Sequence, residues 1–463
     1  IVFGDWSSDV CSSDLRGKEM KSSRKTIQFV LLAVIIVLGA GATYYYFEWE
    51  KPKIVLDKAF DVIGKEREIT LTITDGRSGI RSYSVAFIQG QERFIVAEEE
   101  IPVKGTREKR LALRVVPKTM RLKDGDATFL VKATDCSPLR NTAIHETKIT
   151  IDSVPPRAAL LTGAHNVNPG GTCLAMYRVS KPVASSGVKC ADQFFPGYPV
   201  QASGKTFYTC YFAVPRDVSG ATTMAVVATD RAGNRATTGI PFYVRSTRPF
   251  RSDTVTVGDS FVQQKAVEFQ EQDESLAGRP ATEVFAYVNT DLRADNDRKI
   301  RSICAKTDAR QLWSGTFLRM KNAAPKALFG DERTYVYQEA ALGTSVHLGI
   351  DLASTAQAPV EAANAGTVLF ADFMGIYGNC VIIDHGQGIS SLYAHLSSMA
   401  VKEGDQVARE QVIGNSGATG FAGGDHLHFS ILVSGVFVDP KEWWDPHWIR
   451  DNVESKLGLA DSI

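Results

Sequence analysis

One uncharged stretch near the N-terminus constrains this chain more than any other feature. The run from Ile27 to Phe47 reads IQFVLLAVIIVLGAGATYYYF and contains no charged side chain. About 20 predominantly apolar residues are needed to cross the hydrocarbon core of a bilayer as a helix. We therefore expect residues 27–47 to form a single transmembrane helix in the inner membrane.

The residues around this stretch predict its orientation. Lys21, Arg24 and Lys25 precede it, and basic flanks stay on the cytoplasmic side. Tyr44 and Trp49 lie at the other end, where aromatic side chains mark the far interface. A cleaved signal peptide remains an alternative, because Ala40-Gly41-Ala42 has the small-x-small form of a cleavage site. Under either interpretation the chain after residue 50 is exported to the periplasm.

The first residues do not look like part of a fold. The segment DWSSDVCSSDL, from Asp5 to Leu15, resembles the translation of a sequencing adapter. We therefore interpret residues 1–19 as a non-native leader and exclude them from the fold prediction. Residues 20–50, starting at Met20, are then a cytoplasmic stub and the anchor.

Composition excludes some functions but selects none. The chain has 52 basic and 52 acidic residues among 463, so its net charge gives no indication of nucleic-acid binding. A chain of this length is expected to fold into about three domains.

Two β-sandwiches are predicted after the anchor. Alternating runs such as REITLTITD and ATFLVKATD, separated by turn residues, are typical of sandwich strands. The corner VKATDCSPLRN (Val131 to Asn141) is repeated as VVATDRAGNRA (Val226 to Ala236), with Pro155-Pro156 between the two. The second corner resembles bacterial immunoglobulin-like modules. We expect immunoglobulin-like domains at residues 51–152 and 153–246, as spacers or as ligand-binding modules.

Cysteine usage is compatible with an oxidising compartment. Cys173, Cys190 and Cys210 fall in the second predicted sandwich, so one disulfide among them is plausible, although the sequence does not select the pair.

The residue pattern changes twice in the C-terminal half of the chain. Residues 247–316 are predicted to be a helical connector, since DSFVQQKAVEFQEQ places apolar residues at helical spacing after a capping Asp259. From Phe317 the chain is dense in glycine and β-branched residues, which predicts an antiparallel β-domain at residues 317–450, followed by a tail at 451–463. The predicted fold is therefore mostly β.

Five of the eight histidines lie between His347 and His428. In the segment HLHF, His426 and His428 are two residues apart, so a β-strand would place both on one face. The segment HLGID also offers His347 and Asp351 on a shared face. Imidazole and carboxylate groups bind zinc, and a catalytic zinc needs three protein ligands and one open position. We expect His347, Asp351 and one histidine of the pair to bind the metal.

Other polar residues in this region receive lesser roles. His395, in the segment YAHL, is predicted to act with the non-ligand histidine on water or on a developing oxyanion. His385 is interpreted as structural. Asp384 and Asp425 are interpreted as turn residues or as partners of the ligands, and Tyr393 as a core or groove residue. The glycine-rich loop from Gly414 to Asp425 lacks the Gly-Lys-Ser/Thr ending of a phosphate loop.

These motifs, in the order HLGIDLA, YGN, VIIDHG, YAHLS, IG, SG, TG and HLHF, resemble the lysostaphin-type (LytM-like) zinc endopeptidases of peptidoglycan. The resemblance spans roughly Phe317 to Trp444. It implies that His347, Asp351 and His428 bind one Zn²⁺ per chain. It also implies that His395 and His426 are catalytic.

The resemblance further implies a substrate, namely the peptide cross-links of peptidoglycan, and no cofactor besides zinc. A protein activator or scaffold is a possible partner, and the connector or the segment from Met320 to Tyr335 could cover the cleft until that partner binds. Two other hypotheses are a non-catalytic LytM-like regulator of other wall hydrolases and a structural wall-binding protein.

Overall fold

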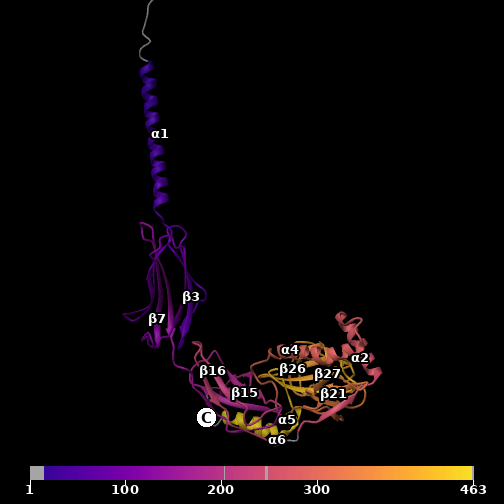
Figure 1. The fold of residues 1–463 in the computed structure, drawn as a ribbon. Coiled ribbons are helices and arrows are strands. Elements are labelled where there is room, and N and C mark those ends of the chain that lie inside the picture. The colour runs from indigo at the N-terminus through magenta and orange to yellow at the C-terminus, as the bar shows by residue number, and fades with distance from the viewer. Residues whose placement is uncertain (1–14, 203, 246–248, 461–463) are drawn as a thin grey trace, which may run out of the picture. The chain divides into compact units, whose positions relative to one another are not determined.

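A computed structural model describes residues 15–202, 204–245 and 249–460 (Figure 1). The chain divides into two compact units, Ile1–Val154 and Pro155–Ile463. The division falls at the Pro155-Pro156 joint. The described residues are mostly β-structure, as the sequence predicted.

The first unit begins with helix α1, Leu15–Tyr46. Its segment Ile27–Tyr44 is long and apolar enough to cross a membrane, by length and composition alone, and none of it is buried in the protein. Most of the predicted leader, residues 1–14, lies outside the described residues, while α1 already includes its last five positions.

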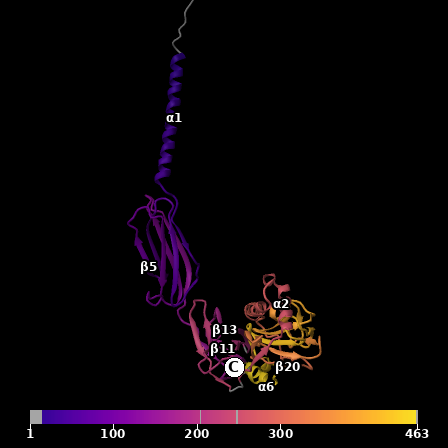
Figure 2. The same cartoon turned by 45° about the vertical axis from the view of Figure 1, so that its right-hand side comes forward.

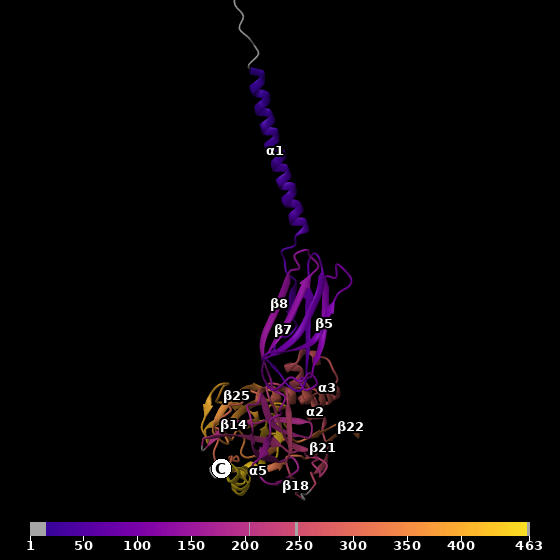
Figure 3. The ribbon, with the colours of Figure 1, turned by 90° about the vertical axis from the view of Figure 1, so that its left-hand side faces the viewer.

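Two sheets packed face to face follow α1 (Figure 3). Strand β3 shows why they form: Ile69, Leu71 and Ile73 alternate with more exposed residues, so one face is apolar and packs against Val85 and Phe129 of the other sheet. The three-stranded sheet has the order β1-β3-β6 (Lys53–Leu56, Arg67–Thr74, Glu108–Val115). The five-stranded sheet has the order β2-β8-β7-β4-β5 (Val62–Ile63, Thr142–Ile151, Gly125–Asp135, Ile80–Gln89, Glu92–Glu100).

The second unit opens with another pair of sheets. One has the order β14-β15-β11-β9 (Tyr198–Ala202, Lys205–Ala213, Thr172–Val179, Ala158–Leu160). The other has the order β13-β12-β16-β17 (Gln193–Pro196, Ser185–Cys190, Met224–Thr229, Arg235–Gly239). Strands β10 (His165–Val167) and β18 (Phe242–Val244) form a short parallel pair. That either sandwich has immunoglobulin topology stays a prediction.

Three further sheets form the C-terminal region. The largest has the order β20-β23-β31-β27-β26-β25-β29, and β32 also pairs with β31. Its strands are β20 (Ala324–Ala327), β23 (Ile350–Ala353), β31 (Leu427–Val433), β27 (Ile389–Leu396), β26 (Asn379–Gly386), β25 (Gly366–Phe373), β29 (Gln406–Val407) and β32 (Val436–Val438). Two three-stranded sheets have the orders β19-β21-β22 (Ser252–Thr256, Glu332–Tyr337, Ala340–Val346) and β24-β30-β28 (Pro359–Glu361, Val412–Asn415, Ser398–Met399).

The central strands β26, β27 and β31 are buried on both faces. One face, which includes Ile383 and Tyr393, packs in a core with Trp443. The opposite face, which includes Ile382 and Leu392, packs against the connector helices (Figure 1). In chain order, these are α2 (Asp259–Gln272), the 3-10 turn η1 (Glu274–Leu276), α3 (Ala281–Tyr287), the π-helical turn η2 (Val288–Leu292) and α4 (Arg293–Cys304).

The connector departs from the prediction at its start. Residues 252–256 form strand β19, which pairs in parallel with β21. Their sequence SDTVT ends in three β-branched residues, Thr254, Val255 and Thr256, which favour a strand over a helix.

The second sandwich is joined to the C-terminal region by a shared core. Tyr211 of β15 packs with its ring 6.2 Å from Trp443 and 6.3 Å from Trp313. The helical elements after β32 are α5 (Pro440–Trp444), α6 (Pro446–Ile449), the π-helical turn η4 (Arg450–Glu454), α7 (Ser455–Leu457) and the 3-10 turn η5 (Gly458–Ala460). Of these, η4 and α7 lie beside β11 (Figure 2). A further 3-10 turn, η3 (Gly375–Tyr377), precedes β26. Residues of the predicted tail thus contribute to this packing.

The expected disulfide is absent among the described cysteines, which are all free thiols. The strand register explains part of this: Cys210 lies opposite Ala175, whereas Cys173 lies opposite Phe212. The Cys210 thiol instead donates a hydrogen bond to the carbonyl oxygen of Phe195, at 3.2 Å. These cysteines behave as small buried hydrophobic residues.

Candidate metal centre

Strand register brings the metal-binding candidates together. Asp351 of β23 lies directly opposite His428 of β31, so their side chains share one face of the sheet. His347 lies between β22 and β23, where the chain bends at Gly349, so it reaches Asp351 across a turn and not along one extended strand. The shared face therefore holds for Asp351 and His428, and His347 arrives by a different route. His426 lies one residue before β31, so the shared strand face of His426 and His428 stays a prediction.

Three ligand atoms converge on one point. His347 Nε2 lies 2.9 Å from Asp351 Oδ1 and 3.0 Å from His428 Nδ1. His428 Nδ1 lies 2.9 Å from the same Asp351 oxygen. The three residues are buried, with at most 9% of each exposed.

Hydrogen bonds on the far side of each ring fix which nitrogen carries the proton. His347 Nδ1–H donates to the carbonyl oxygen of Leu328, at 2.9 Å. Ser430 Oγ–H donates to the carbonyl oxygen of Leu348, so this hydroxyl accepts a hydrogen bond from His428 Nε2–H, at 3.1 Å. The nitrogens that face each other, His347 Nε2 and His428 Nδ1, therefore both present bare lone pairs.

Two lone pairs and a carboxylate oxygen pointing at one another repel unless a cation lies between them. In a tetrahedral zinc site with ligand distances of about 2.0–2.1 Å, neighbouring ligand atoms are about 3.3 Å apart. The observed separations of 2.9 to 3.0 Å need only a few tenths of an ångström of expansion to reach this value. This donor set therefore fits a zinc ion with three protein ligands.

The two predicted catalytic histidines lie beside this centre. The rings of His395 and His426 are 4.8 Å apart, and the His395 ring is 5.8 Å from that of His428. Alternation along β27 would place His395 on the same face as Tyr393, away from His428. Its left-handed backbone (φ 63°), which is uncommon for a residue with a side chain, instead turns the ring towards the centre.

Both of these rings also have a fixed proton. His395 Nδ1–H donates to the carbonyl oxygen of Thr419 at 2.8 Å, and His426 Nδ1–H donates to that of Gly424 at 2.7 Å. Their Nε2 atoms are therefore free to accept a proton. His426 Nε2 lies 3.5 Å from Asp351 Oδ1.

Burial and neighbouring charges shift the pKa values of His395, His426 and Asp351 in different directions. Burial lowers the pKa of His395 well below its usual range, and the neighbouring imidazoles add to this effect. Burial would also lower the pKa of His426, but the hydrogen bond and charge of Asp351 outweigh it and raise the pKa. Burial alone would raise the pKa of Asp351, but its close contacts with His347, His426 and His428 hold it well below its usual range. The site thus contains an ionised carboxylate and a neutral His395.

A cavity of about 160 Å³ opens over the centre. Besides the histidines, its lining includes Arg333 and Tyr377. Arg333 Nη2 lies 3.5 Å from the second oxygen of Asp351. Sequence reasoning missed Arg333, since one arginine in a predicted strand carries no distinguishing signal.

A buried lysine of the connector fixes the glycine-rich loop beside the site. Lys265 Nζ donates to the carbonyl oxygen of Gly420 at 2.6 Å and lies 2.7 Å from Glu268. Glu268 in turn accepts the backbone N–H of Gly420 at 2.9 Å. Because Thr419 in this loop binds His395, helix α2 helps to position that histidine.

The remaining sequence candidates lie away from the centre. His385 is fully buried and bonds to the carbonyl oxygen of Ala365 and to Ser391, each at 2.7 Å. Tyr393 is a core residue whose hydroxyl accepts the backbone N–H of Ala363. The two turn acids hold neighbouring segments: Asp384 accepts from Thr307 and the backbone of Asp308, and Asp425 accepts from Ser416 and the backbone of Gln357.

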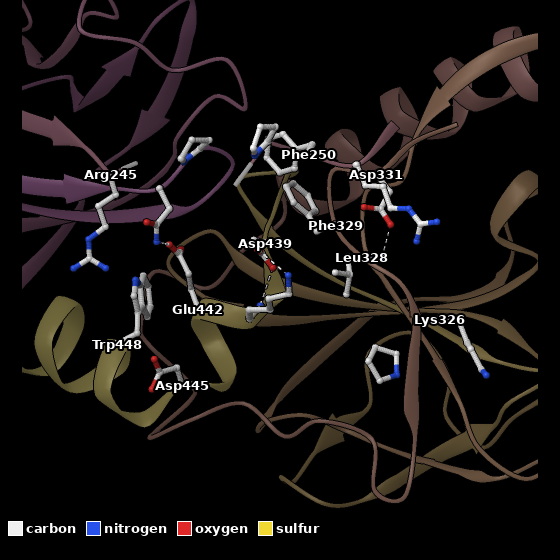
Figure 4. A pocket seen from close by; sticks show the side chains of 16 residues that line it. Arg245, Phe250, Lys326, Leu328, Phe329, Asp331, Asp439, Glu442, Asp445 and Trp448 are labelled. Atoms are coloured by element: carbon white, nitrogen blue, oxygen red, sulfur yellow. Dashed lines mark hydrogen bonds and ion pairs between the residues drawn. The ribbon is translucent and has the colours of Figure 1, made fainter. Parts of the chain in front are cut away.

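A larger cavity of about 800 Å³ lies where the second sandwich meets the C-terminal region (Figure 4). The described residues that line it include no histidine. Its most perturbed group is Glu442, which accepts hydrogen bonds from Asn168 Nδ2 at 2.7 Å and from the backbone N–H of Thr172 at 2.6 Å. Burial raises the pKa of Glu442 to about 8. This carboxyl group joins the two parts of the unit and is remote from the histidines.

Residues 345–440, which hold all five site residues, match the family described as Peptidase family M23. The chain carries a Peptidase family M23 domain at its C-terminus. The DD-carboxypeptidase/endopeptidase Mpg of Neisseria meningitidis serogroup B is 42% identical over 95 residues, which are 20% of this chain and 22% of that protein. The peptidoglycan DD-endopeptidase ShyA of Vibrio cholerae is 40% identical over 89 residues, 19% of this chain and 21% of that protein.

Among solved structures, the catalytic domain of lysostaphin from Staphylococcus simulans is 29% identical, with 26% of this chain and 90% of that one covered and a TM-score of 0.22. The chain spans about a fifth of the length of the two curated relatives named above. The likeness to these relatives is therefore a likeness of the M23 domain.

Proposed function

We propose that this chain is a zinc-dependent endopeptidase that hydrolyses peptide cross-links of peptidoglycan. The observation that carries the proposal is the convergence of two imidazole lone pairs and one carboxylate oxygen on a single point beside two further histidines. The M23 match and the names of the relatives support the reaction and the substrate class.

Each residue has a role in this proposal. His347, Asp351 and His428 would hold the zinc ion, which when bound would polarise the scissile carbonyl and lower the pKa of water. The free Nε2 atoms of His395 and His426 would orient the attacking water and accept its proton. Once protonated, the same nitrogens would donate hydrogen bonds to the anionic tetrahedral intermediate.

The location follows from α1. We propose that this helix anchors the chain in the inner membrane and that the M23 domain faces the wall from the periplasm. The helix is apolar over Ile27–Tyr44, which supports a single span. Alkaline carbonate extraction of membranes would test this: an anchored chain stays in the pellet, whereas a chain cleaved after a signal sequence is released.

The activity test uses the full chain in detergent with purified peptidoglycan. We expect one zinc per chain and release of cleaved cross-links from the wild type, and loss of both in His428→Ala. His447→Ala is the matched control, because His447 is exposed and lies outside the site. Cleavage by His428→Ala at the wild-type rate would refute the proposed centre.

The alternative is a non-catalytic regulator of other wall hydrolases. His395→Ala separates the two hypotheses, because this residue is not among the three proposed ligands. An enzyme would keep its zinc and lose cleavage in His395→Ala. A regulator would bind zinc in both forms and cleave in neither.

A further inference from the structure

Three carboxylates meet inside the first sandwich, far along the chain from the histidine centre. Glu48 follows helix α1, Asp75 follows strand β3, and Asp135 ends strand β7. One carboxylate oxygen from each lies within 4.8 Å of the other two. The three residues are only 5%, 4% and 0% exposed, respectively. Buried carboxylates this close together repel strongly and are costly to desolvate.

Neutral donors satisfy part of this cluster. Asp75 Oδ1 accepts the backbone N–H of Gly79 at 2.6 Å. Asp135 Oδ2 accepts from Asn141 Nδ2 at 2.8 Å, and its other oxygen accepts from the hydroxyl and backbone N–H of Ser137. These donors bring no charge, so they leave the repulsion between the three carboxylates uncompensated.

One oxygen of the cluster has no partner. Glu48 Oε2 accepts the backbone N–H of Ser78 at 3.0 Å, but Glu48 Oε1 is fully buried and makes no hydrogen bond. Among the described residues, no ion pair joins a lysine or arginine to any of the three carboxylates. The pairs that Lys109, Arg110 and Arg114 form in this sandwich involve other acids. A buried, unpaired carboxylate oxygen is among the most costly groups to leave unsatisfied, so this arrangement favours binding of a cation.

The second sandwich shows how the same corner is neutralised elsewhere in this chain. Asp230 occupies the place of Asp135 in the repeated Ala-Thr-Asp corner, and each accepts a hydrogen bond from a following asparagine side chain. Beside Asp230, however, stands the ammonium group of Lys181, at 2.6 Å. In the first sandwich, two further carboxylates stand beside the corner in place of a lysine.

We propose that Glu48, Asp75 and Asp135 bind a calcium ion. The available ligand atoms are all hard oxygens, with no imidazole or thiolate among the three residues, and such sets favour Ca²⁺ over zinc. Calcium sites in extracellular modules bind with dissociation constants of roughly 10⁻⁴–10⁻³ M, which suits an exported domain. Because Glu48 immediately follows α1, the ion would fasten the segment after the helix to the sandwich.

The test is calcium binding by the full chain in detergent, after removal of metals with a chelator. Equilibrium dialysis against ⁴⁵CaCl₂ at millimolar concentration would count the bound ions. We expect the wild type to bind one more Ca²⁺ per chain than Glu48→Gln or Asp135→Asn. Glu50→Gln removes the same charge two residues away at an exposed position, and we expect it to bind as the wild type does.

A second measurement guards against a variant that fails to fold. Hydrogen exchange at the amides of Ser78, Gly79 and Ser137 should slow on addition of CaCl₂ in the wild type and in Glu50→Gln. In Glu48→Gln the same amides should remain protected at a level that CaCl₂ does not change. Equal calcium stoichiometry in the wild type and Glu48→Gln, or no calcium bound by the wild type, would overturn the proposal.

Discussion

The hydroxyl of Ser430 offers a direct test of how the candidate metal centre is held. This side chain is fully buried on β31 and bridges two groups: it accepts from His428 Nε2–H and donates to the carbonyl oxygen of Leu348. Ser430→Ala removes both hydrogen bonds and changes no proposed ligand. The His428 ring would lose the contact that keeps its Nδ1 lone pair aimed at His347 and Asp351.

The expected loss of zinc affinity in Ser430→Ala follows from the hydrogen bonds that the substitution removes. Losing the partner of a metal-binding histidine weakens metal affinity by about 10- to 100-fold. Since a tenfold change corresponds to about 1.4 kcal/mol, this equals roughly 1.4–2.8 kcal/mol. That range also matches the cost of leaving one buried donor without its acceptor, about 1–3 kcal/mol.

The assay is competition for zinc between the protein and a chromophoric chelator. Ser391→Ala is the matched control, because Ser391 is equally buried and bonds to another histidine, His385, at 2.7 Å. We expect the control to lower the unfolding midpoint but to leave zinc affinity unchanged. Equal zinc affinity in Ser430→Ala and the wild type would refute the reasoning about the fixed tautomer.

Three further perturbations have defined outcomes. Gly349→Ala should weaken zinc binding at least tenfold in the same competition assay, because the added Cβ would lie 2.6 Å from His428 Nε2; Gly424→Ala, with open space around it, should not. Lys265→Met should lower the cleavage rate while zinc content stays complete, because it frees the loop at Gly420 and removes the donor to the Gly420 carbonyl oxygen and to Glu268. For Glu442, burial raises the folded-state pKa from 4.5 to about 8, so its contribution to stability is present at low pH and is lost between about pH 4.5 and 8. Thermal unfolding of the wild type should therefore show a larger drop from pH 5.5 to pH 8 than that of Glu442→Gln, and parallel curves would contradict this.

The candidate site was largely predictable because its histidines and Asp351 lie in short, distinctive sequence motifs. The segments HLGID, YAHL and HLHF supply all the histidines that line the cavity over the centre, and His426 and His428 are both among them. The supporting groups were not predictable. Ser430 is an ordinary strand residue in the sequence, and the role of Lys265 depends on where helix α2 packs.

The packing of the second sandwich was missed for a different reason. Repeats and turns predict strands, but they do not show which sheet face a neighbouring domain covers. A signal was present, since Thr172–Val179 and Lys205–Ala213 contain nearly continuous apolar runs, TCLAMY and FYTCYFA. Such runs indicate strands buried on both faces, as β11 and β15 are.

The shared core around Trp443 has a thermodynamic consequence for the chain. Tyr211 of the second sandwich and Trp313 and Phe317 of the C-terminal region all pack against this one indole. If the two parts unfold together, zinc at the proposed site would stabilise the sandwich as well, by about 4 kcal/mol when free zinc exceeds its dissociation constant a thousandfold. Loss of the metal would then lower the unfolding temperature of the second sandwich and speed its proteolysis, although its strands make no contact with the ion.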